Sequence, residues 1–177
     1  SEALMAVYKL FWDEFSSWYL EMVKPAYQQP IDEKTYNQTL DFFETLLKLL
    51  HPFMPFITEE LYQNIKERSE KESIMVSLLP TGKEIKDILI TKMETTKNII
   101  AGIRNIRAEK GISPRETFNM FFKGDFDESN NAIIMKLANI DGIATYNGNN
   151  DNCVSFIVGT TEISIPLGNN INAEEEI

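Results

Sequence analysis

The side chains that most often carry out chemistry are scarce in this sequence. Its 177 residues hold one histidine, His51, and one cysteine, Cys153, which is too few for a Cys/His zinc site or a Cys–His catalytic pair. His51 precedes a proline, and we interpret it as a residue that caps a helix end. The neighbouring carboxylates Glu59 and Glu60 fit the first turn of a helix better than an acid/base pair. The residues alone therefore predict no metal site and no catalytic residue.

Motifs for nucleotide binding and hydrolysis are missing as well. The sequence contains no GxGxxG or GxxxxGK[ST] loop, in which backbone amides cradle phosphates, and neither GxSxG nor HExxH. We therefore expect no cofactor in this chain and no enzymatic activity of the chain by itself.

Positive charge is concentrated in one stretch of an acidic chain. The formal net charge is −10, from 17 Lys and Arg against 27 Asp and Glu. Residues 1–80 carry −6 and residues 124–177 carry −8, whereas residues 81–123 carry +4. The acidity argues against unselective binding of nucleic acid, but a basic island can form a local phosphate-binding surface. A solvated helix face has the same composition, so both interpretations remain open.

A long amphipathic helix over about residues 84–110 is predicted to carry this island. Gly111 is its expected C-cap, and Pro114 follows. Four cations on the flank of its apolar arc are candidate phosphate ligands that we expect to be exposed: Lys83, Lys86, Lys97 and Arg104. Arg107 instead falls within the apolar arc, which predicts a semi-buried arginine paired with a carboxylate or with backbone carbonyls.

The first eighty residues have the periodicity of helices. The apolar seam of the first, over about residues 4–22, is predicted to be core and comprises Leu4, Tyr8, Phe11, Phe15, Trp18 and Met22. A second helix begins with Asp32 as N-cap and ends near His51. A third begins at Thr58 or, given Pro55, slightly earlier. We expect Phe53 and Phe56 to pack inward at the break between these two helices.

The pattern changes after Pro114. Residues 117–122, 143–146, 154–158 and 162–166 read as strands, residues 129–140 as a short helix, and residues 147–152 as an Asn-rich loop. The predicted fold is mainly α: an antiparallel helical bundle over residues 1–112, then a small α+β unit with antiparallel strands over residues 113–170. Residues 171–177 include three consecutive glutamates.

Composition also indicates the cellular compartment of the chain. A single cysteine excludes an intrachain disulfide and fits a reducing compartment, and no apolar run approaches the roughly 18–20 residues that cross a bilayer. We therefore expect a cytoplasmic protein without a membrane partner.

Three stretches resemble the anticodon-binding domain of the valyl-tRNA synthetases. Residues 51–62, HPFMPFITEELY, are similar to the HPFMPFxTEELW signature of that family. Residues 11–21 resemble its W-x-x-F-C-D-W-Y-x-E helix, although Ser16 and Ser17 replace Cys and Asp, and Lys24 matches a downstream lysine. Residues 103–114 resemble its IRxIRAExxxxP segment. The resemblance covers nearly the whole chain in the right order. The ending, Ile163 to Ile177, resembles the family's strand and acidic linker before a coiled coil, so residues 171–177 are expected to be that linker.

This resemblance implies a fragment of a class I aminoacyl-tRNA synthetase. It implies a bundle of the anticodon-binding type and a valine tRNA as partner, with Lys24 added to the candidate tRNA contacts. The HIGH and KMSKS signatures are absent, so ATP with Mg²⁺ and the catalytic domain would belong to the rest of the parent, which we expect to be monomeric and not to bind DNA.

Two alternatives remain from the sequence. Isoleucyl and leucyl enzymes are closely related, but they tend to have AP where this chain has His51-Pro52. A helical protein–protein interaction domain with a merely solvated basic flank is a different class of function. Salt-dependent binding of a tRNA would separate it from an anticodon-binding module.

Overall fold

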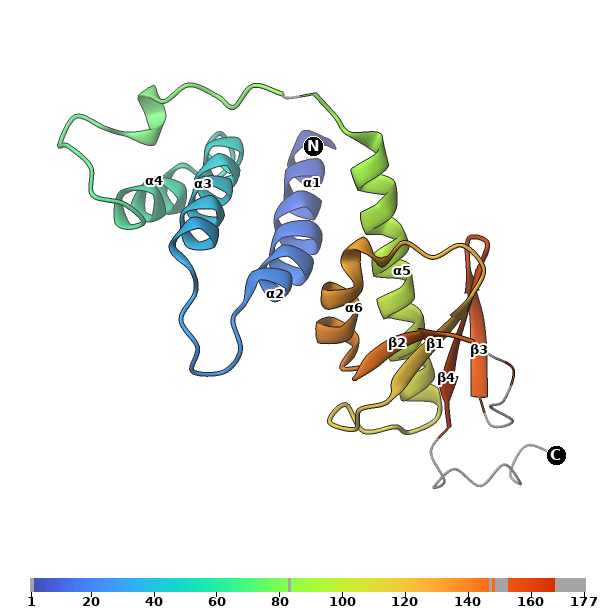
Figure 1. Ribbon diagram of the computed structural model, residues 1–177. Helices are drawn as coiled ribbons and strands as arrows, with labels where there is room; N and C mark the ends of the chain where they lie inside the picture. The colour runs from blue at the N-terminus through green and yellow to red at the C-terminus, as the bar shows by residue number, and fades with distance from the viewer. Residues whose placement is uncertain (1, 83, 147, 149–152, 168–177) are drawn as a thin grey trace. The chain divides into compact units, whose positions relative to one another are not determined.

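The computed structural model describes residues 2–82, 84–146, 148 and 153–167. The chain divides into two compact units, Ser1–Glu84 and Ile85–Ile177 (Figure 1). This division differs from the boundary expected near residue 112, because the long helix packs with the sheet that follows it. The acidic stretch 171–177 and most of the Asn-rich loop lie outside the described residues. Among the helices described, none is both long and apolar enough to cross a membrane.

The first unit starts with an uninterrupted helical rod, as predicted for residues 4–22. Its segments are α1 (Glu2–Lys9), the π-helix η1 (Leu10–Tyr19) and α2 (Leu20–Val23). The π-helical register shows in the bond from the Leu20 N–H to the Phe15 carbonyl, five residues back. The rings of Phe11 and Phe15 lie 6.1 Å and 6.0 Å from that of Phe43. These ring contacts pack the rod against the next helix.

That helix, α3 (Glu33–Leu50), begins where the sequence predicted. The Asp32 carboxylate accepts a hydrogen bond from the Thr35 N–H at 2.9 Å, and this bond lowers the pKa of Asp32. The helix α4 (Pro55–Asn64) follows after a short turn, with Pro55 in its first position. The earlier of its two predicted starts is therefore confirmed.

Phe53 and Phe56 do not pack inward, and that prediction is wrong. Phe53 is 40% exposed and Phe56 is 90% exposed. The buried side chains of α4 are Thr58 and Tyr62, which lie one turn apart on one face. Phe56 precedes Thr58 by two residues, about 200° around the helix, and so faces the opposite side.

A small core lies between α3 and α4. It contains Leu47 from α3, Tyr62 from α4 and Ile74 from the 3₁₀ turn η2 (Ile74–Val76) in the chain that follows α4. The chain that follows α4 is therefore tied to the helices at Ile74.

The second unit combines helices with a four-stranded sheet. Its elements are α5 (Asp87–Glu109), β1 (Asn119–Lys123), η3 (Glu128–Asn130), α6 (Asn131–Ala138), β2 (Gly142–Thr145), β3 (Cys153–Val158) and β4 (Thr161–Pro166). The strand order is β2-β1-β4-β3. Helix α5 packs on α6 and β3, and α6 packs on β2. Both helices therefore belong to the core of this unit.

The prediction that all strands are antiparallel is wrong for one pair. β4 is antiparallel to β1 and β3, but β1 and β2 are parallel, with Met120 opposite Ile143. The chain between β1 and β2 contains α6, and a helical crossover returns the second strand in the direction of the first. The sheet is therefore mixed.

The core of the second unit is made of branched aliphatic side chains. Ile100, Ile103, Ile163 and Ile165 are completely buried, and Met120 joins them. The apolar arc predicted for the long helix is confirmed from Ile99 onward. Its start differs: the helix begins at Asp87 and not near residue 84, so Ile85 precedes it, and Ile85 and Ile88 are 70% and 72% exposed.

Candidate nucleic-acid interface

The turn between α3 and α4 is held by a chain of hydrogen bonds. The Thr58 hydroxyl, in a side chain only 2% exposed, donates to the Met54 carbonyl at 2.7 Å. A hydroxyl has one proton, so its oxygen is left to accept from Nδ1 of His51, 2.7 Å away. His51 therefore makes a structural contact at the end of α3, as predicted.

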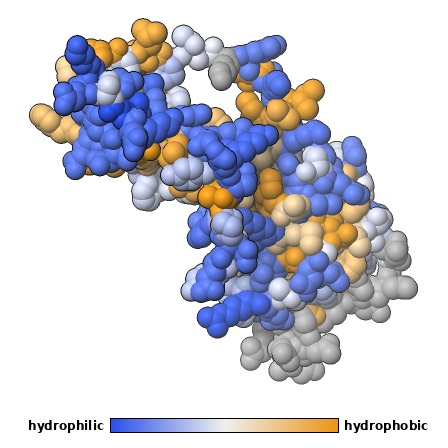
Figure 2. Space-filling model, turned by 60° about the vertical axis from the view of Figure 1, so that its left-hand side comes forward, coloured by the Kyte–Doolittle hydropathy of each residue, from blue (hydrophilic) through white to orange (hydrophobic). Residues whose placement is uncertain are grey.

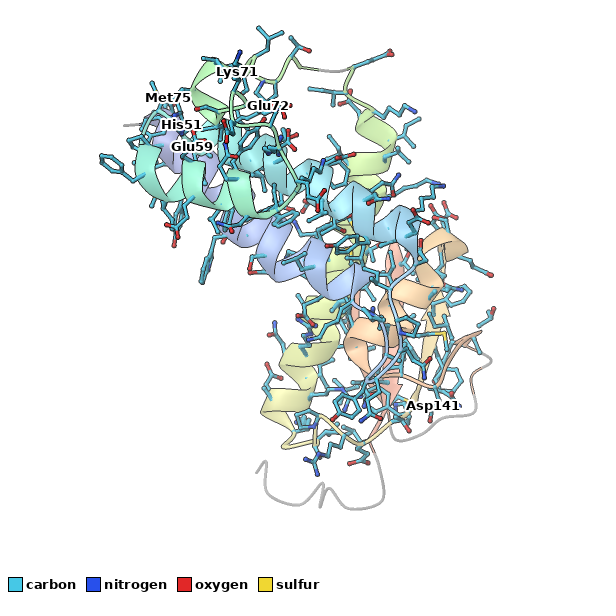
Figure 3. The ribbon with its side chains drawn as sticks, turned by 90° about the vertical axis from the view of Figure 1, so that its left-hand side faces the viewer. His51, Glu59, Lys71, Glu72, Met75 and Asp141 are labelled. Atoms are coloured by element: carbon cyan, nitrogen blue, oxygen red, sulfur yellow. The ribbon has the colours of Figure 1, made fainter. Side chains whose placement is uncertain are left out.

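Glu59 of α4 holds the chain that follows α4 against the same turn between α3 and α4. Its carboxylate accepts from the Ser73 hydroxyl at 2.7 Å and from the Ile74 N–H at 3.1 Å. Hydrogen bonding, that from Gln63 first, lowers the pKa of Glu59. Figure 3 shows His51, Glu59 and Met75 around this turn, where they line a shallow pocket of about 330 Å³. Residues 51–62, the most distinctive sequence motif of the chain, thus form the turn between α3 and α4 and the start of α4.

Glu44 of α3 forms ion pairs with three cations of the first unit. Its carboxylate lies 2.9 Å from Lys48, 3.3 Å from Lys66 and 2.8 Å from Arg68. Burial raises the pKa of Glu44, but the bonds to Lys48 and Arg68 outweigh it and hold the pKa at about 2. Arg68 also stacks on the Tyr62 ring, 3.4 Å from its centroid. These cations are engaged in structure, so they are weak candidates for phosphate binding.

Arg107 is the buried arginine of α5. Its side chain is 6% exposed and lies over the Phe118 ring, 4.2 Å from the centroid. Nη1 donates to the carbonyls of Ser113 and Glu116, each at 2.9 Å, and Nη2 donates to two carbonyls at the end of α6. Burial lowers the pKa of this guanidinium. The backbone carbonyls foreseen as its partners are therefore four, two in the turn after α5 and two at the end of α6.

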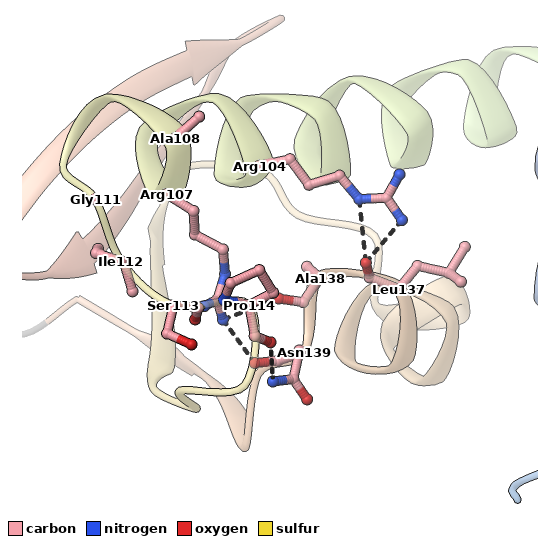
Figure 4. Close-up of a pocket in the computed structure, with 10 residues that line it drawn as sticks. All are labelled: Arg104, Arg107, Ala108, Gly111, Ile112, Ser113, Pro114, Leu137, Ala138 and Asn139. Atoms are coloured by element: carbon pink, nitrogen blue, oxygen red, sulfur yellow. Dashed lines mark hydrogen bonds between the residues drawn. The ribbon is translucent and has the colours of Figure 1, made fainter.

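Arg104 lies one turn before Arg107 and remains exposed. Its Nε and Nη2 donate to the Leu137 carbonyl at 3.2 Å and 2.9 Å. Together the two arginines satisfy carbonyls at the C-terminus of α6, where the helix dipole is negative. They line a groove of about 620 Å³ between the ends of α5 and α6 (Figure 4).

The other candidate contacts occupy different environments. Lys86 is the exposed N-cap of α5, and Lys24 of the first unit is exposed and lies 3.5 Å from Glu21. The Lys97 side chain is only 12% exposed and lies 3.0 Å from Glu94, so its predicted exposure is wrong. Lys83 lies outside the described residues.

Exposed aromatic side chains were missed by the sequence interpretation. Tyr8, predicted to be core, is 51% exposed and stacks in parallel on Trp12, which is 56% exposed. Their spacing of four residues places them together on one face of the rod, whereas Phe15 faces the core. Figure 2 shows hydrophobic residues at the surface among hydrophilic ones. Within the described part of the chain, no cluster of His, Cys, Asp or Glu could hold a metal ion.

Comparison with known families assigns the class of this helical domain. Residues 1–121 match the family described as the anticodon-binding domain of tRNA ligase, and the chain belongs to that family.

The most informative relatives are whole enzymes. The chain is 56% identical to a valine–tRNA ligase of Phocaeicola vulgatus, 52% to one of Parabacteroides distasonis and 49% to one of Porphyromonas gingivalis. Each comparison covers 100% of this chain but 20% of the relative. The chain therefore spans about a fifth of the length of the curated relatives it matches.

Proposed function

We propose that this chain binds the anticodon stem and loop of a valine tRNA as part of a valine–tRNA ligase. The observation that carries the proposal is identity of about half or more, over the whole chain, to three ligases of that name. These names favour valine over isoleucine or leucine as the amino acid of the parent. The chain itself is non-catalytic, and ATP and Mg²⁺ act in other parts of the parent polypeptide, which we place in the cytoplasm as a monomer.

The proposed binding relies on cations that contact phosphates and on the reading of unpaired bases. Lys86 and Arg104 are exposed cations of α5, and such side chains position phosphates without reading sequence. Lys97 is expected to contribute less because its side chain is mostly covered. Lys24 and Lys83 complete the set of proposed phosphate contacts. Reading of unpaired anticodon bases by edge contacts and stacking would supply specificity.

Binding of a 17-nucleotide anticodon stem-loop RNA to the purified chain tests this function. The expected result is binding of the valine stem-loop that weakens steeply with salt, since each neutralised phosphate releases counterions. A stem-loop with the valine stem and an isoleucine anticodon is the matched control and should bind more weakly. Absence of binding at low salt by a folded chain would contradict the proposal and favour the protein-interaction alternative.

A further inference from the structure

The open groove between α5 and α6 has the volume of a ligand site. Its volume of about 620 Å³ lies within the roughly 300–1,000 Å³ typical of small-molecule pockets. Apolar side chains of Ile112, Pro114 and Leu137 line it, and Arg104 and Arg107 provide the polar wall (Figure 4). Residues 137–139 lie beyond the family match, which ends at residue 121.

The hydrogen bonds of the groove leave it electropositive. The end of α6 would by itself present carbonyl oxygens and the negative end of a dipole. Arg104 covers the Leu137 carbonyl at 2.9 Å, and Arg107 covers those of Ala138 and Asn139 at 3.1 Å and 2.8 Å. The acceptors that would repel an anion are therefore occupied by positive groups.

The surrounding sequence adds positive charge. Residues 104–116 contain four Arg or Lys and two Asp or Glu, a net charge of +2 within a chain of −10, and Glu116 is the acid that acts on Arg107. Lys136 precedes the groove on α6 and is exposed. An apolar floor bounded by cations is complementary to an unpaired nucleotide, which has an apolar base face and an anionic phosphate. A protein segment would match this arrangement only if it were both acidic and apolar.

We infer that this groove binds one unpaired nucleotide of RNA, with the base against Ile112, Pro114 and Leu137 and its phosphate beside Arg104. The inference rests on the proposed function and adds a nucleotide subsite in the second unit. Arg107 acts as a positioning residue, because its guanidinium holds the end of α6 and the segment after α5 in place.

Variants of Arg104 and of Leu137 test the subsite, because they should change the affinity for RNA and its salt dependence in different ways. Arg104→Glu should weaken binding of the valine stem-loop about tenfold or more and reduce the salt slope by about 0.7 for the lost phosphate contact. Arg104→Lys should restore the slope, because it restores the charge. Leu137→Ala should weaken binding a few-fold and leave the slope unchanged, because it removes apolar contact only. Lys123→Glu, the same charge change on an exposed residue of β1 outside the groove, is the matched control and should have the smaller effect.

Cross-linking locates the nucleotide independently of affinity. A stem-loop with 4-thiouridine in its loop should cross-link to peptides containing residues 111–115 or 137–141, identified by mass spectrometry. Circular dichroism of each variant checks that it folds. If the wild-type chain binds the stem-loop and both Arg104→Glu and Leu137→Ala bind it with the same affinity, the subsite alone is overturned. Cross-links confined to the first unit would also overturn the subsite alone. A wild-type chain that binds no RNA would overturn the proposed function, and the subsite with it.

Discussion

The absence of a side chain at Gly102 allows α5 to lie close to the sheet. A Cβ at this position would lie 2.6 Å from Cζ and 2.7 Å from Cδ2 of Phe156 on β3. Gly102→Ala should therefore destabilise the second unit by about 1–3 kcal/mol through overpacking, despite the gain of nearly 1 kcal/mol in helix propensity. Denaturant unfolding followed by circular dichroism measures the change.

The double variant Gly102→Ala, Phe156→Ala separates the clash from other effects. Removal of the ring should make the alanine at position 102 neutral or favourable relative to Phe156→Ala alone. Gly82→Ala is the control, because nothing lies within 4 Å of a Cβ there. A stabilised Gly102→Ala single variant would show that the ring does not pack against the helix.

Single residues of α5 also show what sequence spacing can and cannot predict. Arg107 falls on the apolar arc, so its burial followed from helical geometry alone. Its acceptors at Ala138 and Asn139 are more than thirty residues away, and no local pattern indicates them. Lys97 and Arg104 differ by only about 20° around the helix, yet one is covered and the other exposed. Their exposure depends on neighbours that become adjacent only in the fold.

Elements were predicted well where local signals define their ends. The Asp32 cap and Pro55 fixed the starts of α3 and α4. The parallel pairing of β1 with β2 was missed, because strand alternation predicts which face is buried but not which strands are neighbours. The inward orientation expected for Phe56 was also wrong, because the burial of Thr58 and Tyr62 determines which side of α4 faces the core. The groove could not be predicted, since α6 and the end of α5 meet only in the fold.

The charged network between α3 and the chain after α4 makes the first unit sensitive to acid. The pKa of Glu44 is lowered from 4.5 to about 2, so the folded state binds a proton less readily than the unfolded state. The stabilisation is fully present above about pH 4.5 and is lost as the pH falls toward 2. It is on the order of 3 kcal/mol at most. Glu44→Gln should lower stability at pH 7 and flatten the pH dependence in this window.

Tryptophan fluorescence is the suitable readout for this variant, because Trp12 and Trp18, the two tryptophans of the chain, lie in the first unit. Glu60→Gln alters an exposed carboxylate on α4 and should change neither stability nor its pH dependence. If Glu44→Gln retained the wild-type acid transition, another carboxylate would have to be responsible for it.

For the whole molecule, the proposed division of labour predicts the absence of amino-acid activation. The purified chain should give no valine-dependent exchange of pyrophosphate into ATP, since it has none of the phosphate-binding motifs that such chemistry uses. The full-length parent, assayed alongside, should give a clear signal. Exchange by the chain alone that survives repurification would contradict a purely RNA-binding role.

The division of the chain at Glu84 and Ile85 also affects how its unfolding can be followed. Each unit has a core of its own, around Leu47 and Tyr62 in one and around Ile103 and Ile163 in the other, so melting need not be a single cooperative step. Fluorescence detects the loss of the first core only, whereas far-ultraviolet circular dichroism sums the helices of both. A melting temperature measured by fluorescence alone then describes the first unit, and unfolding of the sheet unit has to be followed by circular dichroism.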